Sequence, residues 1–182
     1  NCNKSLKSFK INRSGMGDER LVEIIEALDV HPELEELHLV GMNVGRNECT
    51  ALANILRDTE LLTLFLRDNT IDDEGVDALV GALADVRLSS LNLSCNLNIT
   101  ARGWQRLVAL LEHPNCNLEE LSLIGNTIRN AGARMFANAL ASNRKLKELN
   151  LIRNGITVEG WSSFSKVLCD TSSINRTFLS NH

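Results

Sequence analysis

The sequence predicts an α/β solenoid with a parallel sheet on its concave side and a row of helices on its convex side. Three observations predict this fold class. The leucine pattern returns every 27 to 30 residues. The first half of each unit alternates apolar and polar residues, as a strand does, and the second half places apolar residues four apart, as one face of a helix does.

Six full repeats and part of a seventh fill the chain, which we expect to form one domain over residues 1–182. The repeats begin at Leu6, Leu34, Leu61, Leu88, Leu118 and Leu146, and the partial one begins at Ile174. Residues 1–3 match the end of a preceding repeat at 115–117, and the last repeat stops early. We therefore expect a segment of a longer array.

The strand half of each repeat follows the pattern L-x-x-L-x-L, with its leucines pointing inward. One strand and one helix cannot bury this apolar stripe alone, so the repeats must stack. Neighbouring strands lie about 4.8 Å apart, whereas packed helices need about 8 to 10 Å. This mismatch predicts a curved stack with the sheet on the inside.

An asparagine column follows the strands. It contains Asn69, Asn96, Asn126 and Asn154. We expect these amides to bond backbone groups that the turn would otherwise leave unpaired. Ser14 and Met42 occupy this column in the first two repeats, so the ladder should be weaker there. One extra residue between Asn96 and Ile99 predicts a small bulge in the fourth repeat.

A glycine column marks the helix starts, at Gly75, Gly103, Gly132 and Gly160. The missing Cβ allows close approach of the neighbouring turn, and no phosphate-binding motif is present. The next column alternates large and small side chains at Trp104, Ala133 and Trp161. We interpret it as packing between helices; the alternative is that the two tryptophans are exposed binding anchors.

The repeats resemble those of leucine-rich repeat proteins of the ribonuclease-inhibitor-like subfamily. Repeats five and six carry the complete pattern, and the junction at residues 110–118, LLEHPNCNL, is especially similar to this subfamily. Nucleotide-binding leucine-rich-repeat receptors and Ran GTPase-activating proteins share the repeat type. The resemblance implies a right-handed horseshoe of strands and helices over the whole chain.

Composition argues against several classes of partner. The 182 residues carry a net charge of −4 with a pI of about 5.6, and no basic stripe suited to nucleic acid is present. No apolar window approaches the roughly 18 residues that a membrane span needs. We therefore expect neither nucleic-acid nor membrane binding.

Five cysteines without a C-x-x-C pair fit neither a disulfide framework nor a zinc site. They favour a reducing compartment, and we expect a cytoplasmic protein. Glycosylation sequons favour the alternative, a secreted or cell-surface protein. The sequons lie at Asn3, Asn12, Asn92, Asn98 and Asn175.

No arrangement of residues points to catalysis, a metal or a cofactor. Of the histidines, only His38 is expected on the concave face. The acidic run at residues 72–74 precedes a helix, where it would offset the helix dipole rather than bind a metal. Cys95 follows a strand without a neighbouring base, which favours an inert thiol. We expect a protein that is not an enzyme.

The candidate binding residues are those that the repeat leaves free on the outward face of the sheet, at the third, fifth and seventh positions. They are Glu36, His38, Val40, Phe65, Arg67, Glu120, Ile124, Glu148 and Ile152, together with the neighbouring Arg153. Ile124 and Ile152 lie one strand apart, with charged residues around them. An apolar centre with a charged rim is typical of a protein interface.

The sequence therefore predicts a non-enzymatic scaffold that binds another protein, of unspecified identity, on its concave face. Two alternatives remain. The first is a GTPase-activating protein similar to the Ran regulators, although the acidic tail of that family is missing. The second is the ligand-sensing or autoinhibitory repeat domain of an innate-immune-type receptor.

Overall fold

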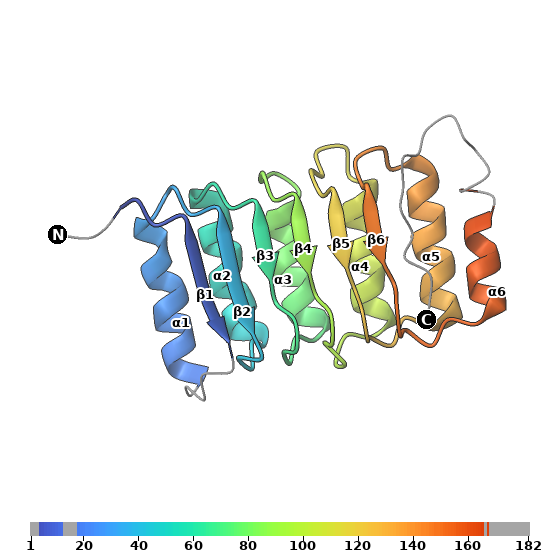
Figure 1. The fold of residues 1–182 in the computed structure, drawn as a ribbon, viewed down its shortest axis with the longest axis horizontal. Coiled ribbons are helices and arrows are strands. Elements are labelled where there is room, and N and C mark those ends of the chain that lie inside the picture. The colour runs from blue at the N-terminus through green and yellow to red at the C-terminus, as the bar shows by residue number, and fades with distance from the viewer. Residues whose placement is uncertain (1–3, 13–17, 166, 168–182) are drawn as a thin grey trace.

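The computed structural model describes residues 4–12, 18–165 and 167. Among these residues, six parallel strands form one sheet in chain order, and each is followed by a helix (Figure 1). The first three repeats contain β1 (Ser8–Asn12), α1 (Asp18–Ala27), the 3₁₀ helix η1 (Leu28–Val30), β2 (Glu36–Val40), α2 (Arg46–Asp58), β3 (Thr63–Phe65) and α3 (Asp73–Leu83). The next three contain β4 (Ser90–Asn92), α4 (Ala101–Glu112), β5 (Glu120–Ser122), α5 (Arg129–Ser142), β6 (Glu148–Asn150), α6 (Val158–Trp161) and the 3₁₀ helix η2 (Ser162–Phe164).

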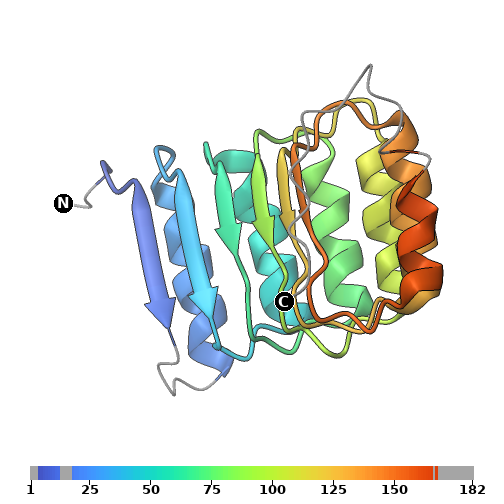
Figure 2. The same cartoon turned by 45° about the vertical axis from the view of Figure 1, so that its right-hand side comes forward.

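The strands form one layer and the helices form a second layer behind it (Figures 1 and 2). The helix row extends past the sheet at both ends, with α1 beyond β1 and α6 beyond β6 (Figure 1). The helix row is thus the longer of the two, as the difference between strand and helix spacing requires. The predicted fold class is confirmed, with the sheet on the concave side.

Buried leucines run through the centre of the sheet. The residues aligned by the strand register are Leu37, Leu64, Leu91, Leu121 and Leu149, at most 4% exposed. Neighbours on each strand point the opposite way because side chains alternate with period two. Each strand therefore packs one face on the helices and presents the other on the concave side.

The asparagine column ties neighbouring repeats together, and its predicted structural role is confirmed. Asn126 Oδ1 accepts a hydrogen bond from the Asn96 backbone N–H at 2.7 Å. Its Nδ2 donates to the carbonyl oxygens of Leu93 and Leu123, each at 3.0 Å. Because Leu93 belongs to the preceding repeat, one side chain satisfies the backbone of two turns.

A second column precedes the asparagines, and the sequence analysis did not identify it. Its residues have left-handed backbone conformations, with φ between 57° and 68°. They are Gly41, Asp68, Cys95, Gly125 and Arg153. This conformation turns the chain sharply after the strand, and only glycine adopts it without a steric cost. The repeat therefore tolerates strain at three of these five positions.

Three glycines of the column lie where a helix closely approaches the preceding repeat, as predicted; at Gly132 a Cβ would meet only Ile128 of the same repeat. A Cβ on Gly103 would lie 2.6 Å from Asp73 Oδ1, and one on Gly160 would lie 2.6 Å from Asn130 Oδ1. The missing side chains therefore leave room for a polar group from the preceding helix to reach the start of the next one.

The large-small packing column is also confirmed at its centre. Trp104 is 1% exposed and Ala133 is fully buried, so Trp104 is not an exposed anchor. Trp161 is half-buried and packs on Phe164, with ring centroids 5.6 Å apart. The bulge expected in the fourth repeat is present as an additional turn, in which Leu97 is 66% exposed.

Some predictions lie outside the described residues, namely Ser14 in the asparagine column and the partial repeat from Ile174. Within the described ranges, no helix is long and apolar enough to cross a membrane.

Candidate protein interface

The candidate residues fall into two groups on the concave side. Glu36, His38, Phe65, Glu120 and Glu148 lie on strands at outward positions, and Val40 ends β2. Arg67, Ile124, Ile152 and Arg153 lie just after their strands, because β3, β5 and β6 are only three residues long. The first group lies on the surface of the sheet, and the second lies along the C-terminal ends of the strands.

The apolar candidates are half-buried rather than fully exposed. This holds for Val40, Phe65, Ile124 and Ile152. Ile124 and Ile152 belong to neighbouring turns that are joined by a hydrogen bond from the Gly125 N–H to the Ile152 carbonyl at 2.9 Å. The two isoleucines are therefore on adjacent turns, as predicted, with part of each surface available.

The prediction that every seventh position faces outward is wrong for Ser94. Its side chain is fully buried, and its hydroxyl lies 3.0 Å from that of Ser122 and accepts the Ile124 N–H at 3.1 Å. Because the strands end before this position, the chain is already turning there. A small hydroxyl can fold into the turn, whereas a larger side chain at the same position stays outside.

At the β1–β3 end of the concave face, the charges neutralise one another. The Glu36 carboxylate accepts bonds from Lys10, Ser8 and His38, each at 2.8 Å. The Lys10 ammonium, with help from the Ser8 and His38 bonds, lowers the pKa of Glu36 to about 2. The His38 ring packs against Phe65 at a centroid distance of 4.2 Å. This end of the face is internally paired.

Between β3 and β6 the concave face has two adjoining hollows, of about 300 Å³ and 210 Å³. Both are lined by Phe65, Ser90 and Glu120. Glu119 borders the larger hollow and Glu148 the smaller. The sequence analysis identified Glu120 and Glu148 but missed Ser90 and Glu119, because a hollow depends on side-chain sizes across several strands.

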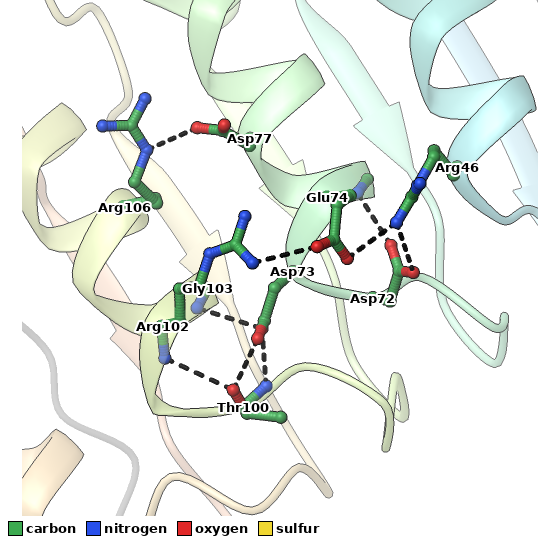
Figure 3. Close-up of polar contacts among 10 residues, drawn as sticks. Arg46, Asp72, Asp73, Glu74, Asp77, Thr100, Arg102, Gly103 and Arg106 are labelled. Carbon is green, nitrogen blue, oxygen red and sulfur yellow. Dashed lines mark hydrogen bonds and ion pairs between the residues drawn. The ribbon is translucent and has the colours of Figure 1, made fainter.

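A second group of charges lies where the helices begin, and there the acidic run extends further than predicted. Asp72 is the N-cap of α3 and accepts the Gly75 N–H at 2.8 Å, as expected for a capping carboxylate. Asp73, however, reaches the next repeat and accepts the N–H groups of Thr100 at 2.8 Å and Gly103 at 3.0 Å (Figure 3).

Glu74 connects three repeats. Its carboxylate lies between Arg46 of α2, at 3.0 Å, and Arg102 of α4, at 2.9 Å (Figure 3). The Arg102 bond and the Arg46 bond lower the pKa of Glu74. The acidic run is therefore a set of contacts between repeats, and no group of metal-ligating side chains occurs anywhere in the described ranges.

Two of the described thiols are unsuited to nucleophilic chemistry. Burial raises the pKa of Cys49 and of Cys116, which disfavours the reactive thiolate. Cys95 is half-buried and is held in the left-handed column. We therefore take the concave sheet, with its two hollows, as the candidate interface.

Comparison with known proteins gives the family. The profile of the Leucine Rich repeat family matches residues 59–80, 115–137 and 142–165. These segments are separate units of the stacked strand and helix array described above. The chain is a leucine-rich repeat protein. The matched segments include β3, β5 and β6, three of the four strands that line the two hollows.

This leucine-rich repeat protein is similar to members of two of the groups that its sequence resembles. It is 32% identical over 142 residues to human NACHT, LRR and PYD domains-containing protein 13, which covers 76% of this chain and 13% of that protein. It is 33% identical over 132 residues to mouse ribonuclease inhibitor, covering 70% of this chain and 28% of the inhibitor. The chain thus spans a small part of each relative.

Solved structures support the fold of the leucine-rich repeat protein. Leiomodin-1 Actin-Binding Site 2 superposes with a TM-score of 0.63 at 19% identity, covering 78% of this chain and 82% of that one. The C-terminal domain of Caenorhabditis elegans tropomodulin gives 0.50 at 17% identity, with 91% and 84% covered. At these identities the likeness concerns the architecture alone.

Proposed function

We propose that this repeat array is a non-enzymatic, cytoplasmic scaffold that binds a protein partner on the concave face of its sheet. One observation carries the proposal. No described element covers that face, although it holds half-buried apolar side chains and two hollows. Surfaces of this kind, with apolar anchors among charged groups, are typical of protein interfaces.

The mechanism we propose is rigid display. The leucine row and the asparagine column hold each strand to its neighbours, so the concave surface exists before a partner arrives. Binding then orders few groups of the array itself, and a small number of anchors can determine the affinity. The relationship to ribonuclease inhibitor, whose name denotes action on another protein, supports this class of function.

A second candidate is the repeat segment of a multidomain receptor. Several relatives are NACHT, LRR and PYD domains-containing proteins, of which the aligned region makes up 12–14%. In that case, the partner of the concave face would be a ligand or another domain of the same protein. Sequencing the transcript on both sides of this segment would decide between the two candidates.

Site-specific crosslinking tests the concave face directly. The photoreactive residue p-benzoylphenylalanine replaces either Thr63, on β3, or Gln105, an exposed residue of α4, and cells are irradiated before the crosslinked proteins are identified. We expect one defined protein to be captured from Thr63 and not from Gln105. Capture from Gln105 alone would overturn the proposal, because the partner would then bind the helices.

The apolar pair gives an independent test. The double variant Ile124→Asp/Ile152→Asp should lose the partner captured from Thr63 while keeping the circular dichroism spectrum of the folded array. The matched control is Leu97→Asp, because Leu97 is exposed in the additional turn of the fourth repeat. The control should keep the partner, and retention by both variants would show that the isoleucines are not part of the interface.

A further inference from the structure

The concave carboxylates differ in whether another side chain neutralises them. Near the start of the strands, Glu35, Glu36 and Glu119 each lie within 2.8 Å of a lysine nitrogen. Glu120 and Glu148 have no cationic partner among the described residues. Glu120 accepts only the Ser90 hydroxyl, at 3.0 Å.

These two carboxylates occupy matching positions on neighbouring strands. Glu120 of β5 is the register partner of Glu148 of β6. Adjacent strands are about 4.8 Å apart, so two acidic side chains start from neighbouring strands. The candidate arginines, Arg67 and Arg153, follow the C-terminal ends of their strands, whereas Glu120 and Glu148 lie at the N-terminal ends of theirs. A cation supplied by a partner would meet both carboxylates at this surface.

The shape of the surface beside the carboxylates narrows the chemistry of that cation. Both hollows share the Phe65 side chain on one side and Glu120 on another, and the smaller one also reaches Glu148. A guanidinium group is planar, stacks on aromatic rings and donates paired hydrogen bonds to carboxylates. A lysine ammonium or a metal ion would use the carboxylates but gain less from the aromatic wall.

We propose that the hollows between β3 and β6 receive an arginine side chain of the protein partner, stacked on Phe65 and paired with Glu120 and Glu148. This inference rests on the proposed function and adds the chemistry of the partner. It assigns the two ends of the concave face different roles. The β1–β3 end is internally neutralised, whereas the β5–β6 end is the acidic recognition surface.

A pair of model peptides tests the proposal. The first is a nine-residue peptide of glycine and serine with one central arginine, and the second has uncharged citrulline in its place. Each is titrated into the ¹⁵N-labelled chain while amide shifts are followed by NMR. We expect the arginine peptide to shift the amides of Ser90, Glu120 and Glu148, and the citrulline peptide to bind at least about tenfold more weakly.

Variants separate specific recognition from general attraction to an acidic protein. Glu120→Gln/Glu148→Gln should weaken binding of the arginine peptide by about tenfold or more, whereas Glu112→Gln, at the exposed end of α4, should leave it unchanged. Equal affinity for both peptides, shifts confined to other surfaces, or equal losses in the two variants would each overturn the inference.

The experiments distinguish failure of the arginine inference from failure of the proposed function. If Thr63 crosslinks a partner but the arginine peptide does not use the hollows, the concave face binds proteins and the inference about arginine is wrong. If crosslinking occurs only from Gln105, the proposed function itself is wrong. The proteins crosslinked from Thr63 should also carry an exposed arginine at the contact, which mass spectrometry of the linked peptide identifies.

Discussion

The helix starts and the concave face carry similar charged side chains but use them differently. At the helix starts, Asp73 accepts two N–H groups of the next repeat, and Glu74 lies between two arginines. On the concave face, Glu120 and Glu148 occupy matching register positions without a cationic partner among the described residues. The difference teaches that charges bonded to a neighbouring repeat hold the array together, whereas the carboxylates of Glu120 and Glu148 remain available to a partner.

The largest effect should come from the buried contacts between repeats. Asn126→Ala leaves the Asn96 N–H and two backbone carbonyls without their partner inside a closed turn. We expect the free energy of unfolding to fall by about 3 kcal/mol, measured by urea denaturation at pH 7.

The matched control is Asn138→Ala, which alters an exposed asparagine of α5. It should change the free energy of unfolding by less than about 0.5 kcal/mol. Equal losses in the two variants would mean that the asparagine column does not hold the repeats together.

A smaller effect is expected at the helix starts. Asp73→Ala removes an acceptor for the Thr100 and Gly103 N–H groups at the start of α4. Loss of such a cap typically costs about 1 to 2 kcal/mol of stability. Asp77→Ala is the control, since it removes only an exposed ion pair with Arg106 and should cost less than about 1 kcal/mol. The comparison is made by urea denaturation, and an equal loss in both would argue against capping between repeats.

The Asp73 contact should also depend on pH. Burial raises the pKa of Asp73. The bonds from Thr100 and Gly103, together with the nearby Arg102 charge, lower this pKa by more than burial raises it, so the net shift is downward. Stability from a carboxylate with a lowered pKa is full above its unfolded pKa, near 3.9, and is lost as pH falls through the folded value. The stability difference between wild type and Asp73→Asn should therefore narrow from pH 5 to pH 2. A constant difference over that range would contradict this assignment.

The smallest effect on stability should be found on the concave face. Glu120→Gln/Glu148→Gln removes no ion pair among the described residues, so the unfolding free energy should change by less than about 0.5 kcal/mol. In contrast, Glu74→Gln should lower the melting temperature, because it removes the charge held by Arg46 and Arg102. A marked loss of stability in the concave double variant would show that these carboxylates are structural.

The repeat pattern predicted the fold because each of its columns has a local physical role. Leu121 and its aligned neighbours are buried as expected, and Asn126 and Gly103 act in the turns where the pattern placed them. The column of left-handed backbone conformations was missed because Cys95 and Arg153 are residue types that seldom adopt a positive φ. At Cys95 the turn is held by a bond from its N–H to the Ile124 carbonyl of the next repeat, at 2.8 Å.

The candidate interface was predicted less completely. Strand alternation placed Glu120, Glu148 and Phe65 on the concave face, but it could not show which carboxylates already have partners. Ser94 was placed outside and is buried, because the strand ends before it. Pairing and burial at these positions depend on neighbouring repeats about 28 residues away, as in the hydroxyl contact with Ser122.

By itself, the sequence determined the order of strand and helix in each repeat and the face on which the aligned leucines lie, because these follow from periods of 2, about 4 and about 28 residues. Only the tertiary structure decided which charges are neutralised and where the concave face is hollowed. Those properties depend on distances of a few ångströms between side chains of different repeats, and the spacing of residues along one chain does not encode such distances.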